Sequence, residues 1–153
     1  MAIVGQGYVG LPLAISATRA GWQVTGIDVS DRIVSNLNSK KSHVEDVLDS
    51  DIENAIAGGV YQATSKGEVA SESDICVICV PTPLDEKGLP DLTFLESAVR
   101  LVAPHLPSHA LLVSESTSYP GTVRDFVKPL VASIRPDRAE NMNFASAPER
   151  VDP

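Results

Sequence analysis

Three glycines early in the chain have the spacing of a phosphate-binding loop. Residues 5–10 read Gly-Gln-Gly-Tyr-Val-Gly and fit the pattern G-x-G-x-x-G. In that pattern Gly5 permits a tight turn, Gly7 lets the backbone approach a pyrophosphate, and Gly10 lets a helix pack closely on a strand. A helix that begins near Val9 points its N–H groups and the positive end of its dipole at the phosphates. We therefore expect contacts from Gly5, Gly7, Tyr8, Val9 and Gly10.

An aspartate follows this loop at the distance typical of dinucleotide-binding proteins. Asp28 lies 18 residues after Gly10, at the end of a predicted strand. Its carboxylate is placed to accept hydrogen bonds from the hydroxyls of an adenine ribose, and the alternative is that it caps the following helix. A carboxylate here disfavours the 2′-phosphate of NADP, so the predicted cofactor is NAD. Arg32, one turn later, either reaches a phosphate or is a solvated helix residue.

Polar side chains also follow the later predicted strands. Thr82 comes after the most apolar strand, and Thr117 comes after the next one. Ligands of open α/β sheets bind at the carboxyl ends of the strands, so both hydroxyls are candidates for ligand contacts. The alternative for Thr82 is a rigid turn with a solvent-facing hydroxyl. Glu149 follows the last strand and is suited to act as a base in a partly dry cleft, or else pairs with a neighbouring arginine.

The cysteines and histidines do not form a redox or metal site by their spacing. Cys76 and Cys79 read C-x-x-C but lie inside a predicted strand, where residues three apart face opposite sides. We therefore interpret both as small core residues with inert thiols. His43, His105 and His109 show no ligand spacing, and no metal is predicted.

The elements that must position these residues alternate between strand and helix. The strand with the strongest signal, residues 74–80, has a continuously apolar interior, as expected for a strand buried on both faces. Such alternation is typical of an α/β fold, a Rossmann-like doubly wound parallel sheet with helices on both faces. The predicted strands are 2–4, 23–27, 60–63, 74–80, 110–113 and 144–147, and the predicted helices are 9–20, 31–39, 49–57, 93–105 and 122–134.

Composition limits the class of protein. The chain has 153 residues, 43% apolar and 21% charged, which suits a single globular domain. Its formal net charge of −8 argues against a general nucleic-acid surface. No run approaches the roughly 20 apolar residues that span a bilayer, and no basic segment precedes a signal-peptide core, so a soluble cytoplasmic protein is expected. The short first strand and the abrupt end after the last one suggest one domain of a longer protein.

Four stretches together resemble one enzyme family. They are residues 5–14 (GQGYVGLPLA), 80–83 (VPTP), 115–122 (ESTSYPGT) and 147–153 (APERVDP). In this order and spacing they are similar to the N-terminal domain of the UDP-glucose/GDP-mannose dehydrogenase family. The forms PER and YPGT resemble the branch that acts on UDP-N-acetylhexosamines, with UDP-N-acetylglucosamine favoured and UDP-N-acetylmannosamine next.

The resemblance implies a function for the domain. Family members oxidise the C6 alcohol of a nucleotide sugar to a carboxylate with two NAD per turnover, through a thioester on a cysteine of a later segment. It implies that Thr82 contacts NAD, that Thr117 lies beside the nicotinamide and the reacting carbon, and that Glu149 assists hydrolysis. Arg150 is implied to contact the UDP-sugar substrate. Residues 1–153 then form the NAD-binding domain, followed by a helical linker and a UDP-binding domain that completes the site and the homo-oligomer.

Two other functions fit part of the pattern. A non-catalytic NAD-binding regulatory module needs the glycine loop and Asp28, but not Thr82, Thr117 and Glu149 together. A dehydrogenase of 3-hydroxy acids would share only the glycine loop, and the stretches 80–83 and 148–150 argue against it.

Overall fold

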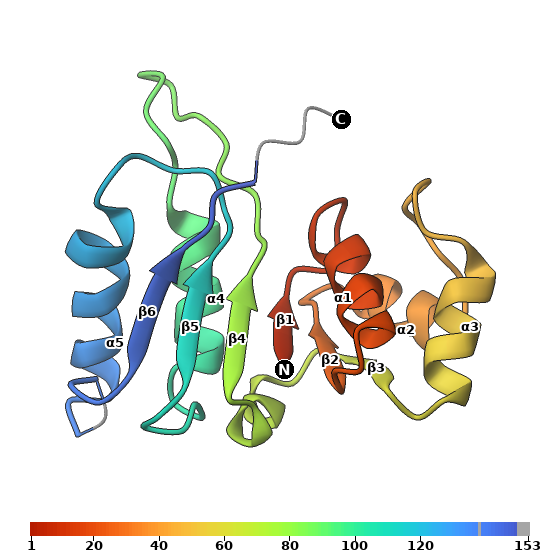
Figure 1. Cartoon of the computed structure of the whole chain (residues 1–153). Coiled ribbons are helices and arrows are strands. Elements are labelled where there is room, and N and C mark those ends of the chain that lie inside the picture. Colours follow the sequence, from red (N-terminus) through yellow and green to blue (C-terminus); the bar gives the residue numbers. More distant parts are fainter. Residues whose placement is uncertain (138, 150–153) are drawn as a thin grey trace.

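A parallel sheet forms the centre of the molecule and confirms the predicted fold class (Figure 1). In this computed structural model, which describes residues 1–137 and 139–149, the strand order is β3-β2-β1-β4-β5-β6. All neighbouring strands of that sheet pair in parallel, with Ile3 opposite Gly26 on one side and Val77 on the other. The strands are β1 (Ala2–Val4), β2 (Val24–Ile27), β3 (Tyr61–Thr64), β4 (Ile75–Ile78), β5 (Leu111–Ser114) and β6 (Asn143–Ser146).

Helices cover both faces of the sheet, as the sequence predicts. Side chains alternate across β1, so Ala2 and Val4 enter one core while Ile3 enters the other. The first core is closed by α4 and α5, and the second by α1, α2 and α3. The helices are α1 (Gly10–Arg19), α2 (Asp31–Asn38), α3 (Asp49–Ala57), α4 (Thr93–Val102) and α5 (Lys128–Ile134).

The single helix predicted over residues 122–134 is wrong in its first half. Val123–Val127 forms a π-helix, and the regular helix α5 begins only at Lys128. The N–H of Lys128 accordingly donates to the carbonyl of Val123, five residues back. Pro129 has no N–H to continue the α-helical pattern, so the wider turn sits where that pattern is already interrupted. A short 3₁₀ helix, Gly67–Glu72, is a further element that the sequence analysis did not anticipate.

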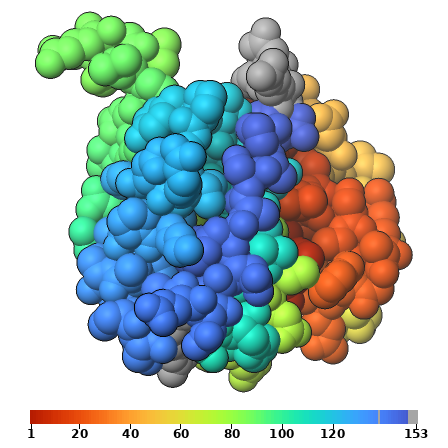
Figure 2. Space-filling model, turned by 60° about the vertical axis from the view of Figure 1, so that its left-hand side comes forward, coloured from red at the N-terminus to blue at the C-terminus, as the bar shows by residue number. Residues whose placement is uncertain are grey.

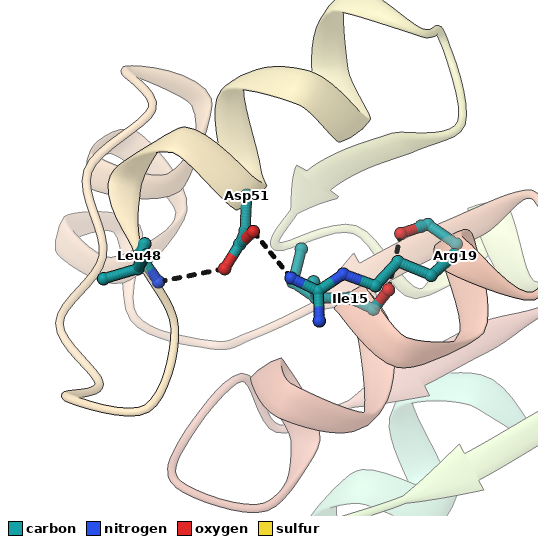
Figure 3. A network of polar contacts seen from close by, with 5 residues as sticks. Ile15, Arg19, Leu48 and Asp51 are labelled. Carbon is teal, nitrogen blue, oxygen red and sulfur yellow. Dashed lines mark hydrogen bonds and ion pairs between the residues drawn. The ribbon is translucent and has the colours of Figure 1, made fainter.

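On the surface, α1 and α3 are tied by one acidic side chain (Figure 3). Asp51 receives a hydrogen bond of 2.6 Å from the guanidinium of Arg19 and one of 3.3 Å from the backbone N–H of Leu48. The second bond satisfies a donor at the start of α3. Because Arg19 is well exposed, the ion pair adds little to stability and mainly fixes the side chain of Asp51.

The loop after β4 is a small hairpin that projects from the molecule. Figure 2 shows it as a green arm that stands clear of the body. Leu84 and Pro90 form an antiparallel bridge, and the N–H of Asp85 donates to the carbonyl of Leu89 at 2.7 Å. Gly88 closes the turn with φ of 74°. The tip, residues 85–88, is exposed. None of the helices in the described residues is long and apolar enough to cross a membrane.

Candidate functional site

A cleft opens at the carboxyl edge of the sheet, where the strand order reverses between β1 and β4. Ligands of doubly wound sheets bind at this switch point. The cleft has a volume of about 420 Å³, within the range of small-molecule sites. It brings together eight residues that the sequence analysis selected: Gly5, Gly7, Tyr8, Val9, Asp28, Thr82, Thr117 and Glu149.

Protein atoms pack closely against two of the three glycines, Gly5 and Gly10, whereas the space beside Gly7 is empty. Gly5 has φ of 88°, and a Cβ added there would lie 2.5 Å from the carbonyl oxygen of Cys79. A Cβ on Gly10 would lie 1.8 Å from the carbonyl oxygen of Gly5, so helix and loop require glycine there. A Cβ on Gly7 would meet no atom within 4 Å. The space beside Gly7 therefore faces the cleft and fits the pyrophosphate of a dinucleotide.

Asp28 is held by the backbone and does not cap the next helix. Its Oδ2 accepts a hydrogen bond of 2.8 Å from the N–H of Gln6, and its Oδ1 accepts one of 2.9 Å from the N–H of Ser30. The N-cap of α2 is Ser30, whose hydroxyl accepts from Ile33, so the capping alternative for Asp28 is wrong. Each carboxylate oxygen retains a lone pair for a further donor, as recognition of ribose hydroxyls requires.

Gln6 supports both the glycine loop and Asp28, and the sequence analysis missed it. Its side chain is fully buried, and its Nε2 donates to the carbonyl of Ile3 at 2.9 Å. Its Oε1 accepts from the Tyr61 hydroxyl at 2.8 Å, and its backbone carbonyl lies 2.8 Å from Nε2 of His43. Burial, and secondarily the charge of Asp28, raise the pKa of Tyr61, so this hydroxyl remains a donor. The pattern G-x-G-x-x-G treats position 6 as free and gives no signal for this role.

Three predicted residues meet through hydrogen bonds at the other end of the cleft. The Thr82 hydroxyl donates to the carbonyl of Thr117, and the Thr117 hydroxyl donates to the carbonyl of Glu149. The N–H of Glu149 in turn donates to the carbonyl of Glu115 at 3.1 Å. Thr82 is therefore not a residue with a merely solvent-facing hydroxyl. With their protons committed, both threonine oxygens present acceptor lone pairs.

The two cysteines differ in their surroundings. Cys76 is fully buried, and burial raises the pKa of its thiol to about 12, which confirms an inert core residue. Cys79 is only partly buried: it packs against the second core, as predicted, and it also lines the cleft, which was not predicted. Its Sγ donates to Oε2 of Glu115 at 3.0 Å. Burial, and then the bond to Glu115, raise the pKa of this thiol too. The described residues contain no cluster of potential metal ligands.

A second, apolar slot of about 210 Å³ adjoins the cleft at Asp28 and was not predicted. Its walls include Val29, which is 80% exposed, and Phe94, which is 50% exposed. Val29 directly follows Asp28, and this neighbour is the signal that could have found it, whereas Phe94, the second residue of α4, lies beside no candidate in the sequence. An exposed apolar slot beside an acidic side chain has the chemistry to accept a flat base.

Arg32 does not line the cleft. Arg32 is exposed in the first turn of α2, and Ile33 rather than Arg32 lines the cleft. Arg150 lies outside the described residues.

Comparison with known proteins agrees with this geometry. The profile described as "UDP-glucose/GDP-mannose dehydrogenase family, NAD binding domain" matches residues 1–153. The UDP-N-acetyl-D-mannosamine dehydrogenases of Pyrococcus horikoshii and Escherichia coli K12 are 34% and 36% identical over 100% of the chain. The crystal structure of GDP-mannose dehydrogenase from Pseudomonas aeruginosa superposes with a TM-score of 0.91 at 29% identity, over 99% of this chain and 36% of that one.

The chain matches only part of each relative's length, and one solved structure shares only its fold. The chain spans 37% and 38% of the lengths of the two curated relatives. A 3-hydroxyisobutyrate dehydrogenase from Salmonella typhimurium gives a TM-score of 0.59 at 19% identity, over 94% of this chain and 39% of that one. That likeness is one of fold alone, and the comparisons favour a nucleotide-sugar dehydrogenase over a 3-hydroxy acid dehydrogenase.

Proposed function

The chain belongs to the UDP-glucose/GDP-mannose dehydrogenase family as its NAD-binding domain, and from this premise we propose the reaction that it serves. The longer enzyme oxidises the C6 hydroxyl of a UDP-sugar to a uronate in two NAD-dependent steps. The observation that carries the proposal is the cleft itself, which has a dinucleotide cradle at one end and the Thr82, Thr117 and Glu149 chain at the other. A purely regulatory NAD-binding module does not require Thr82, Thr117 and Glu149 together.

The dinucleotide end has one role for each residue. The open face of Gly7 receives the pyrophosphate, and the carboxylate of Asp28 accepts the hydroxyls of the adenine ribose. Val29 and Phe94 contact the adenine in the apolar slot. The bound NAD supplies the hydride acceptor at its nicotinamide ring. Tyr8 and Val9 complete the wall of the cleft beside the loop.

The other end positions the reacting groups. Thr117 Oγ1, whose proton is donated to the backbone carbonyl of Glu149, offers a lone pair to a substrate hydroxyl or a water. Thr82 fixes the loop that carries Thr117 and contacts the cofactor. Glu149 serves as the base for hydrolysis of the acyl intermediate that the family resemblance implies. Arg150 contacts the substrate.

The substrate class proposed is a UDP-N-acetylhexosamine. The sequence motifs favour the gluco sugar, whereas the relatives named UDP-N-acetyl-D-mannosamine dehydrogenase favour the manno epimer. We give the manno epimer priority because those relatives match over the whole chain. We further propose a cytoplasmic enzyme that forms a homo-oligomer through segments outside residues 1–153.

The test is turnover by the longer protein that contains this domain. UDP-N-acetylmannosamine, UDP-N-acetylglucosamine, UDP-glucose and GDP-mannose are offered in turn, and NADH formation is followed by absorbance. We expect two NADH for each acetamido sugar consumed. NAD binding without reduction by any sugar nucleotide would instead support the regulatory module.

A further inference from the structure

The carboxylate of Glu115, directly after β5, is held by the thiol of Cys79, directly after β4. Oε2 of Glu115 accepts the hydrogen bond from Sγ of Cys79 at 3.0 Å. The Cys79 side chain lies directly against the glycine loop, because a Cβ on Gly10 would come within 3.2 Å of its Cβ. Glu115 is only partly exposed, and both residues line the cleft. The pair therefore has a defined place beneath the loop.

This place belongs to the nicotinamide half of the cleft. Asp28, which also lines the apolar slot, follows β2 on one side of the glycine loop, and Glu115 follows β5 on the other side. The assignment of the halves rests on the proposed function. A dinucleotide crosses the sheet at the switch point, so its two ends occupy opposite sides of the loop.

The charge of Glu115 is not neutralised by a basic side chain of the cleft. The charged residues among the described lining set are Asp28, Glu115 and Glu149, all acidic, and no lysine, arginine or histidine is among them. The nicotinamide ring carries a positive charge when oxidised and none when reduced. A fixed, partly desolvated carboxylate attracts the charged form and is indifferent to the neutral one.

We propose that Glu115 makes the cleft select the oxidised over the reduced cofactor, and that Cys79 is the positioning residue that holds its carboxylate in place. The selection helps product NADH to leave between the two oxidation steps. Cys79 suits the task because its raised pKa keeps the thiol protonated, so it remains a donor and adds no competing negative charge. Glu149 is a weaker candidate because it is exposed, where water screens its charge.

The experiment measures the dissociation constants of NAD⁺ and NADH for the 153-residue chain by calorimetry. Glu115→Gln keeps an acceptor for the Cys79 thiol and removes only the charge. We expect it to weaken NAD⁺ about tenfold and to leave NADH unchanged. Glu72→Gln, an exposed carboxylate in the 3₁₀ helix before β4, is the charge-matched control and should change neither constant. Cys79→Ser keeps a donor and should behave as wild type, whereas Cys79→Ala should lose about threefold in NAD⁺ selectivity.

The wild-type chain provides a second measurement that needs no variant. Raising the salt concentration should narrow its preference for NAD⁺ over NADH, because the selection is electrostatic. The inference is overturned if Glu115→Gln lowers the affinities for NAD⁺ and NADH equally, or changes neither affinity. A preference for NAD⁺ that does not depend on salt would overturn it too. None of these results would contradict the proposal that the chain binds NAD. Wild-type behaviour of Cys79→Ala would overturn the role given to Cys79. A wild-type chain that binds neither form would contradict the proposed function itself.

Discussion

The backbone N–H of Gln6 donates a 2.8 Å hydrogen bond to Oδ2 of Asp28, 22 residues along the chain. The residue between the first two glycines thus orients the acid that directly follows β2. Since the same glutamine is anchored through its side chain to Ile3 and Tyr61, the glycine loop, β1 and β3 form one support for the carboxylate. Loop and acid are parts of one site.

Gln6→Leu tests this support. The substitution leaves the buried Tyr61 hydroxyl without its acceptor, and we expect a loss of about 1–3 kcal/mol in the free energy of unfolding, measured with urea. Tyr61→Phe leaves Oε1 of Gln6 without its donor but keeps the bond from Nε2 of Gln6 to Ile3, and it should cost about 1 kcal/mol. Unchanged stability in Gln6→Leu would show that the buried network is not a structural support.

Gly7→Ala and Gly10→Ala form a matched pair that separates binding from folding. An alanine at position 7 meets no protein atom within 4 Å, so thermal stability should persist while NAD binding falls at least tenfold through a clash with the pyrophosphate. An alanine at position 10 clashes with the Gly5 carbonyl and should lower the melting temperature. Normal NAD affinity in a stable Gly7→Ala variant would show that the loop is a structural turn and does not bind the pyrophosphate.

The buried thiol of Cys76 predicts a loss of stability in alkali. Burial raises its pKa from the ordinary 9.0 to about 12, so the unfolded chain loses this proton more readily than the folded one. The contribution of this thiol to stability is complete below pH 9 and declines as the pH rises from 9 to 12. Urea unfolding at pH 8 and pH 10.5 measures the decline, and Cys76→Ala should make it smaller. An equal decline in both proteins would assign it to other groups.

We expect the 153-residue chain to turn over no UDP-sugar. The route implied by the family resemblance needs a reactive thiolate, and the pKa values of both Cys76 and Cys79 are raised. Incubation with NAD and UDP-N-acetylmannosamine, followed by NADH absorbance, checks this, with the longer protein as the positive control. Turnover by the isolated chain would require a different mechanism.

Local patterns were sufficient for the strands and for much of the site. The continuous apolar run of β4 and the spacing of Gly5, Gly7 and Gly10 reflect short-range constraints, so both were predictable. The partners of Gln6 and Cys79 come from strands and loops far along the chain, and no periodicity encodes such contacts. The π-helix at Val123–Val127 was missed because its apolar spacing resembles that of an α-helix.

Titration of the 153-residue chain with NAD and NADP by calorimetry tests the central claim, that Asp28 and the glycine loop form an NAD site. We expect the chain to bind NAD at least tenfold more tightly than NADP, because the carboxylate of Asp28 repels a 2′-phosphate. Asp28→Ala should weaken NAD and narrow the difference, while Glu72→Gln should alter neither. Equal affinities for the two cofactors in the wild-type chain, or a preference unchanged in Asp28→Ala, would contradict the account.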